Sequence, residues 1–187
     1  LFACFKFYSG KLHIRDYNLL NIAFLFVILF TTGYVIIKNG WAVWYIPFSA
    51  VIMLSTILFA QIQISFMITF ASAVTIASIA HNSFSCAVLF LISGIFSSII
   101  IFDARKRMDI IRAGLVIGLI QAISLFFISG HFRTADMAGY IIFLLNGVVC
   151  SMIVLGILPV FEYLFKTITN VSLLELTDFN HPLLQRL

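Results

Sequence analysis

The sequence predicts an all-α protein, a polytopic helical membrane bundle with six complete transmembrane helices and the stub of a preceding one. Hydrophobic residues make up 63% of its 187 residues and charged residues 10%, whereas a soluble chain contains roughly 45–50% and about 25%, respectively. A soluble domain of this length could not bury so much apolar surface. The charged residues are also grouped, and the apolar runs between the groups are long enough to cross a bilayer as helices.

Residues 1–8 and 9–18 form two short pieces ahead of the first complete span. Residues 1–8 are apolar and aromatic but too few to cross a bilayer, so we expect them to be the stub of a preceding transmembrane helix. Residues 9–18 are polar and carry Lys11, Arg15 and Asp16, and we expect them to form a cytoplasmic connector. Because the sequence opens with a residue other than Met and ends inside a predicted helix, we expect it to be a segment of a longer protein.

Two uncharged runs determine the number of spans in the first half of the chain. Residues 17–37 contain no Asp, Glu, Lys or Arg and match the roughly 20 residues that a helix needs to cross the hydrocarbon core. Residues 39–102 are equally free of charge but far too many for one crossing. The basic residues before the first run and after the second run are both expected in the cytoplasm. Lys38, between the two runs, is then outside, so the second run must cross the membrane an odd number of times. Three crossings of roughly 20 residues fit, with breaks predicted at residues 61–63 and 81–83.

The six predicted spans form a bundle over residues 19–166. A polar loop at residues 130–136 separates the last two, and Pro159 lies near the inner end of the last. The spans are expected at residues 17–37, 44–60, 64–80, 84–102, 113–129 and 137–161.

A basic stretch at residues 102–112 sets the predicted orientation. It holds four of the 11 Lys and Arg residues, and short loops rich in Lys and Arg remain on the cytoplasmic side of a membrane. With this loop inside, only Lys38 and Arg133 lie outside, and the C-terminus is cytoplasmic. All the Trp and Tyr residues then fall near span ends, where membrane proteins place interfacial aromatic residues. The stretch is either a solvated turn that only sets topology or a contact surface for anionic lipid heads or for an attached cytoplasmic domain.

Residues 167–187 predict two short amphipathic helices after the last span. Ser172 and Glu175 have the spacing of a capping box that starts a helix, and Pro182 suits the first turn of a second one. Two such helices are typical of a linker between a membrane span and a cytoplasmic domain.

Among the polar side chains of the spans, Gln121 and Asn146 are expected at mid-membrane depth. An unpaired amide is costly there, so interhelical hydrogen bonds are the expected role and a ligand pocket is the alternative. Small residues spaced four apart predict close contacts between helices. These pairs are Gly114/Gly118, Gly94/Ser98, Gly147/Ser151 and Ala73/Ala77.

The sequence supplies no catalytic, cofactor-binding or metal site. The four His residues lie in separate loops without an HExxH or paired-carboxylate pattern, and the three Cys residues form no CxxC or Cys/His cluster. His81, His131 and Asp136 lie on the same predicted side and are the one candidate metal set, but a role as polar interfacial residues explains them better. The formal charge of +4 does not indicate nucleic acid, because the basic residues lie between apolar runs.

Four segments carry a resemblance to a known family: residues 105–115 (RKRMDIIRAGL), Leu145-Asn146-Gly147, residues 158–165 (LPVFEYLF) and residues 173–184 (LLELTDFNHPLL). They resemble the bacterial seven-transmembrane HD phosphodiesterases, the last segment most specifically, and the resemblance covers the chain from about Lys11 to its end.

This resemblance implies an extracellular domain ahead of seven membrane helices, of which residues 1–8 would end the first. It also implies a following cytoplasmic HD domain that hydrolyses cyclic di-AMP with two divalent transition metals held by His and Asp residues. The HD motif would begin beyond Leu187, so the resemblance assigns no catalytic, cofactor-binding or metal residue to this chain.

The sequence therefore predicts the transmembrane anchoring and signal-relay domain of a membrane-bound HD-type cyclic di-AMP phosphodiesterase in a bacterial cytoplasmic membrane. This domain would couple an extracellular sensor to the cytoplasmic hydrolase. Its expected partners are the lipid bilayer and its own extracellular and HD domains, with a homo-oligomer left open and nucleic acid excluded.

Two other classes of function are weaker interpretations of the same sequence. A small polytopic transporter or channel subunit is the alternative, but transport of ions or polar solutes usually requires ionisable groups inside the spans. An intramembrane enzyme would require a nucleophile–base pair or a metal cluster, and the spans contain neither.

Overall fold

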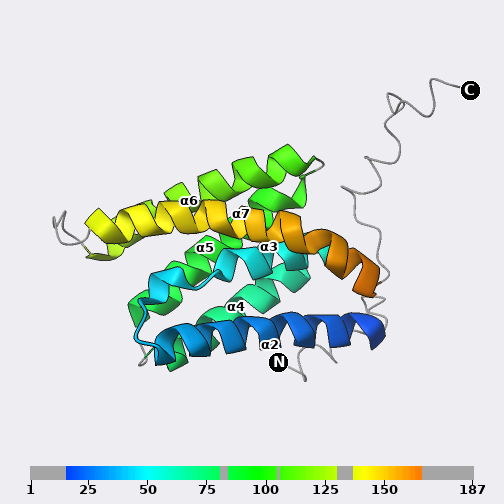
Figure 1. The fold of residues 1–187 in the computed structure, drawn as a ribbon, viewed down its shortest axis with the longest axis horizontal. Coiled ribbons are helices and arrows are strands. Elements are labelled where there is room, and N and C mark those ends of the chain that lie inside the picture. Colours follow the sequence, from blue (N-terminus) through cyan, green and yellow to red (C-terminus); the bar gives the residue numbers. More distant parts are fainter. Residues whose placement is uncertain (1–15, 81–83, 105, 130–136, 166–187) are drawn as a thin grey trace, which may run out of the picture.

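The computed structural model describes residues 16–80, 84–104, 106–129 and 137–165, and every regular element in these ranges is a helix (Figure 1). Figure 1 shows the helices running side by side as a bundle. The elements are α2 (Asp16–Lys38), the 3₁₀ helix η1 (Val43–Tyr45), α3 (Phe48–Phe59), α4 (Ile62–Ile79), α5 (Phe84–Phe102), α6 (Arg107–Ser129) and α7 (Met137–Phe165).

Five of the described helices, α2, α4, α5, α6 and α7, are long and apolar enough to cross a membrane. In lipid, a helix is favoured because it satisfies its backbone N–H and C=O groups within itself. The predicted helical membrane bundle is therefore confirmed, with five of the six expected spans long enough to cross.

The remaining expected span, the second in chain order at residues 44–60, is not a continuous helix. α3 contains 12 residues, which is about 18 Å of helix against a hydrocarbon core of roughly 30 Å. Ile46 and Pro47 separate it from η1. Pro47 explains the break, because proline lacks a backbone N–H and disfavours helical geometry at the residue before it.

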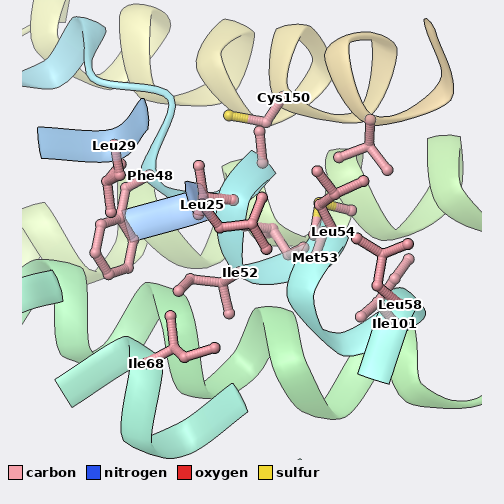
Figure 2. Close-up of a cluster of buried hydrophobic side chains, with 14 of the residues drawn as sticks. Leu25, Leu29, Phe48, Ile52, Met53, Leu54, Leu58, Ile68, Ile101 and Cys150 are labelled. Atoms are coloured by element: carbon pink, nitrogen blue, oxygen red, sulfur yellow. The ribbon is translucent and has the colours of Figure 1, made fainter. Parts of the chain in front are cut away.

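α3 lies at the centre of the bundle, in contact with α2, α4, α5 and α7. All of its residues except Ile57 and Phe59 are buried. Figure 2 shows its side chains among those of the surrounding helices. The labelled core residues are Phe48, Ile52, Met53, Leu54 and Leu58 of α3, Leu25 and Leu29 of α2, Ile68 of α4, Ile101 of α5 and Cys150 of α7.

Glycines bring α6 and α7 into backbone contact, as the spacing of small residues predicts. A Cβ atom added to Gly114 would lie 2.6 Å from the carbonyl oxygen of Gly147, and one added to Gly118 would lie 2.6 Å from that of Leu144. Real Cβ atoms essentially never approach another heavy atom so closely. The two helices can therefore pack at this distance only because α6 has no side chain at these positions.

α6 and α7 extend furthest beyond the predicted spans. α6 begins at Arg107 rather than at residue 113, and α7 continues to Phe165 rather than ending at residue 161. The predictions counted uncharged residues, whereas a helix continues past the hydrocarbon boundary into charged sequence. At the start of α6, the backbone N–H of Lys106 donates to the Asp109 carboxylate at 3.0 Å, which satisfies one amide that the helix leaves unpaired.

The break predicted at residues 61–63 lies one to two residues earlier in the structure. There Ala60 adopts left-handed backbone with a φ of 49°, and α4 starts at Ile62. Several other predictions fall outside the described residues: the stub at residues 1–8, most of the connector, the breaks at residues 81–83 and 130–136, and the linker at residues 167–187.

Candidate functional site

The break between η1 and α3 leaves irregular backbone inside the bundle. Ile46 is extended, and Pro47 has a φ of −77° and a ψ of 54°, which is the geometry of an inverse γ-turn. The Phe48 N–H accordingly donates to the Ile46 carbonyl oxygen at 2.8 Å. Irregular backbone at membrane depth requires partners from the protein or from a cavity, so the groups around this break are candidates for a functional site.

α7 supplies a partner to this break from its buried face. The Asn146 side chain donates from Nδ2 to the same Ile46 oxygen at 3.1 Å. Asn146 lies about 14 Å along α7 from Met137, well inside a membrane-crossing helix. The expectation that Asn146 forms an interhelical hydrogen bond is thereby confirmed.

Cys150 lies one turn after Asn146 and faces the N-terminus of α3. Pro47, the N-cap residue, provides no side-chain hydrogen bond to the helix. The backbone N–H groups of Ser49 and Ala50 instead face the Cys150 sulfur, and the Cys150 thiol donates to Asn146 Oδ1 at 3.5 Å. Asn146 and Cys150 of α7 therefore both lie against the start of α3.

A second cluster joins α3 to α5 and α6. Gln121 of α6 donates from Nε2 to the hydroxyl of Ser49 at 2.8 Å and to that of Ser93 at 2.7 Å. The two hydroxyl oxygens lie 2.9 Å apart, and all three side chains are fully buried. Gln121 Oε1 has no hydrogen-bond partner among the described residues. The expected interhelical role of Gln121 is confirmed for its amide nitrogen.

The other end of α3 is tied to α4. The Thr56 hydroxyl donates to the Ser65 hydroxyl oxygen at 2.9 Å and also lies 2.8 Å from the carbonyl oxygen of Ile52. Both side chains are buried. α3 is thus held by side-chain hydrogen bonds at its N-terminal end to α5 and α6 and at its C-terminal end to α4, while the break ahead of it is held to α7.

The sequence of this bundle matches a known protein family. The family model described as "7TM receptor with intracellular HD hydrolase" matches residues 1–169. The chain belongs to this family. No solved structure matches the chain.

Two curated relatives share one name. The cyclic-di-AMP phosphodiesterase PgpH of Listeria monocytogenes (serotype 1/2a, strain 10403S) is 25% identical over 182 residues, which cover 94% of this chain and 23% of the relative. The cyclic-di-AMP phosphodiesterase PgpH of Bacillus subtilis (strain 168) is 29% identical over 105 residues, covering 54% of this chain and 15% of the relative. The chain therefore spans less than a quarter of the length of either relative.

In this member of the 7TM–HD family, the basic turn between α5 and α6 lies at the same end of the bundle as the end of α7 (Figure 1). Lys106, Arg107 and Arg112 are exposed, whereas Arg105 lies outside the described residues. The turn is therefore accessible to a partner at the end of the bundle from which α7 leaves.

The described part of the 7TM–HD chain contains no group of three or more His, Cys, Asp or Glu residues placed to hold a metal ion. The candidate set of His81, His131 and Asp136 lies outside the described residues, so it stays a prediction. Several buried polar residues form the hydrogen-bond clusters around α3, with side chains from α3, α4, α5, α6 and α7.

Sequence reasoning identified Gln121 and Asn146 but missed their partners. Ser49 and Ser93 carried no signal, because serine is common in membrane helices and usually bonds to its own helix. Pro47 was the available signal: a proline within a predicted span marks backbone that needs donors from elsewhere. Two amides in later spans were the obvious source of such donors.

Proposed function

We propose that this chain is the transmembrane anchoring and signal-relay domain of a membrane-bound HD-type cyclic di-AMP phosphodiesterase. Membership of the family and likeness to the two PgpH proteins support the anchoring role. The observation that carries the relay role is the hydrogen bond from Asn146 of α7 to the backbone break ahead of α3. α7 is also the last described helix, and the sequence continues from it toward the predicted linker.

α7 is well suited to carry a movement through the bundle. It is one helix of 29 residues, it packs against α6 through glycine contacts, and its Asn146 side chain hydrogen-bonds to Ile46 just ahead of α3. A shift of α7 along or about its axis must therefore alter the contacts at the centre of the bundle. The same shift would displace Phe165, where α7 ends.

The proposal includes a topology and a division of the chain. η1 and α3 together would make one crossing. With the five long helices, they would give a six-crossing bundle over residues 19–166 with a cytoplasmic C-terminus. Residues 1–8 would be the end of a preceding span, residues 9–18 a cytoplasmic connector and residues 167–187 the linker to the HD domain. The two divalent transition metals of the hydrolase would belong to that HD domain.

The transporter alternative gains no support from the described helices. The buried polar side chains among the described residues are Ser, Thr, Asn and Gln, and no Asp, Glu, Lys or Arg is among them. These neutral groups are engaged mainly with each other or with backbone oxygens.

A linker insertion in the full-length enzyme tests the relay. Flexible Gly and Ser residues inserted between Thr169 and Asn170 cannot hold the orientation of one domain against another. We expect the basal rate of cyclic di-AMP hydrolysis, or its response to an external signal, to change while membrane insertion does not. An unchanged rate together with an unchanged response would contradict the relay and leave a passive tether.

A further inference from the structure

A groove of about 430 Å³ lies between α2 and α7, over the segment that leads into α3. η1 packs against both helices, and Figure 1 shows this segment passing between them. The groove thus has two helical walls and a floor of irregular backbone. Its described lining residues are Thr31, Thr32, Val35 and Ile36 of α2, Tyr45 and Pro47 of the floor, and Asn146, Val149 and Ile153 of α7.

The groove lies at the depth of the hydrocarbon chains of one leaflet. α2 ends at Lys38, whose ammonium group lies 5.7 Å from the centre of the Tyr34 ring, and a Lys beside an aromatic ring is typical of the membrane interface. Thr31 and Ile36 precede Lys38 by about 10 Å and 3 Å of helix, respectively. The lining residues of α2 are therefore just below the interface on the Lys38 side.

The chemistry of the lining favours an apolar, uncharged occupant. None of the described lining residues is charged, so an ion or an anionic nucleotide would find no opposite charge. The Thr31 and Thr32 hydroxyls donate to carbonyl oxygens of their own helix at 2.8–3.0 Å, and Asn146 donates to Ile46. The polar groups of the walls are therefore already engaged.

Neither water nor an empty space fits this groove well. A bound water needs two to four polar partners, roughly three on average, and most partners in these walls are engaged by the protein itself. An unfilled groove would leave the atoms of Val35, Val149 and Ile153 without contacts on one side. Hydrocarbon chains of lipids surround a bundle at this depth in a bilayer, whereas the predicted stub of a preceding helix at residues 1–8 lies outside the described residues.

We propose that the groove between α2 and α7 binds one acyl chain of a membrane phospholipid. The chain lies between Val35 and Val149, over Pro47, and its neighbour in the wall is the amide that holds the α3 break. The groove differs from the outer faces of the single helices, because α2 and α7 flank it and the segment of Tyr45 and Pro47 forms its floor. It does not depend on the relay proposed above, since an anchor without relay could bind the same chain.

Photocrosslinking to a phospholipid tests this site. The full chain in detergent is titrated with phosphatidylglycerol that carries a diazirine in one acyl chain, and the crosslinked positions are mapped by peptide mass spectrometry. We expect saturation at one lipid per chain, with crosslinks concentrated at the lining residues of α2 and α7.

Matched tryptophan substitutions show whether the groove itself is the site. Val35 lines the groove and is 53% exposed, whereas Val27 of the same helix is 55% exposed and is not among the lining residues. Val35→Trp fills the groove and should abolish most of the crosslinking, and Val27→Trp should leave it unchanged. Val149→Trp tests the opposite wall. Thermal unfolding of each variant checks that the fold is retained.

Three results would overturn the proposal. One is crosslinking that rises linearly with lipid and is spread evenly over the exposed faces of the helices. Another is full crosslinking in both Val35→Trp and Val149→Trp. The third is complete displacement by an equimolar free fatty acid of the same length, which would assign the groove to fatty acid rather than to phospholipid.

Discussion

Asn146 and Gln121 are both buried amides in membrane helices, and the bundle uses them differently. Asn146 donates to a backbone oxygen at a helix break. Gln121 donates to two serine hydroxyls and leaves its Oε1 without a partner among the described residues. Serine hydroxyls can bond to each other or to their own helix, whereas a carbonyl at a break depends on the few donors that reach it. We therefore expect the two amides to differ in their effect on stability.

Asn146→Leu should lower the free energy of unfolding by about 1–2 kcal/mol, because it removes a donor from irregular backbone inside the membrane. The measurement is unfolding in mixed micelles titrated with SDS. The neighbouring Leu145 is 54% exposed, and Leu145→Met is the control that should leave the midpoint unchanged. A wild-type midpoint for Asn146→Leu would show that the Phe48 N–H alone satisfies the Ile46 oxygen or that another donor replaces the amide.

Gln121→Leu should cost about 0.6 kcal/mol or less in the same titration. The substitution removes two hydrogen bonds, but it also removes the unpartnered Oε1, and the Ser49 and Ser93 hydroxyls remain 2.9 Å apart and able to bond to each other. A loss larger than that of Asn146→Leu would contradict this ordering and would mean that Gln121 Oε1 is engaged in the membrane-embedded protein.

The sequence predicted which side chains need hydrogen bonds, but it did not predict which groups provide them. An amide at mid-membrane depth must find a partner, so the need for hydrogen bonds was readable from Gln121 and Asn146 alone. The identity of the partner depends on which helices are adjacent, and neither hydroxyls nor backbone oxygens show that in the sequence. Ser49 and Ser93 are 44 residues apart, which no local pattern connects.

Among the helices, the long ones were predictable and the short one was not. An uncharged run of sufficient length dictates a helix in lipid, and α2, α4 and α5 lie close to their predicted bounds. α3 was expected as a full span, because its apolar composition is the same as that of its neighbours. Pro47 divides that segment, and the resulting short helix is stable because it is surrounded by four others.

The contact of α6 with α7 can be tested with two glycines that differ only in their surroundings. Gly118→Ala should lower stability by about 1–3 kcal/mol, because the added Cβ would press on the Leu144 backbone. Gly156 of α7 has no heavy atom within 4 Å of an added Cβ, so Gly156→Ala should be neutral or stabilise by up to about 1 kcal/mol.

Thermal unfolding in detergent of both glycine variants is the measurement. Equal stability of the two would mean that α6 and α7 separate readily, and that the small residues at this contact are incidental.

For the whole molecule, the described helices leave the orientation in the membrane as a prediction. Lys38 and Lys106 are both exposed and lie at opposite ends of the bundle. Their predicted sides follow from the basic residues around the α5–α6 turn, because such residues remain in the cytoplasm.

Cysteine labelling in intact cells measures this orientation. In a background without native cysteines, with Cys150→Ser to keep an acceptor at the α3 start, Lys38→Cys should react with an impermeant thiol reagent. Lys106→Cys should react only after the membrane is permeabilised. Labelling of Lys106→Cys in intact cells would reverse the bundle and the proposed cytoplasmic position of the linker.

The hydrogen bond between Asn146 and Ile46 also has a consequence for biosynthesis. Its two residues are 100 positions apart, and a ribosome adding about 5–20 residues per second takes roughly 5–20 s to travel that distance. During this interval the segment around Pro47 has already been made, while the amide that completes it has not. The newly inserted α3 must therefore wait beside the insertion machinery, or in a loosely packed intermediate, until α7 has been synthesised.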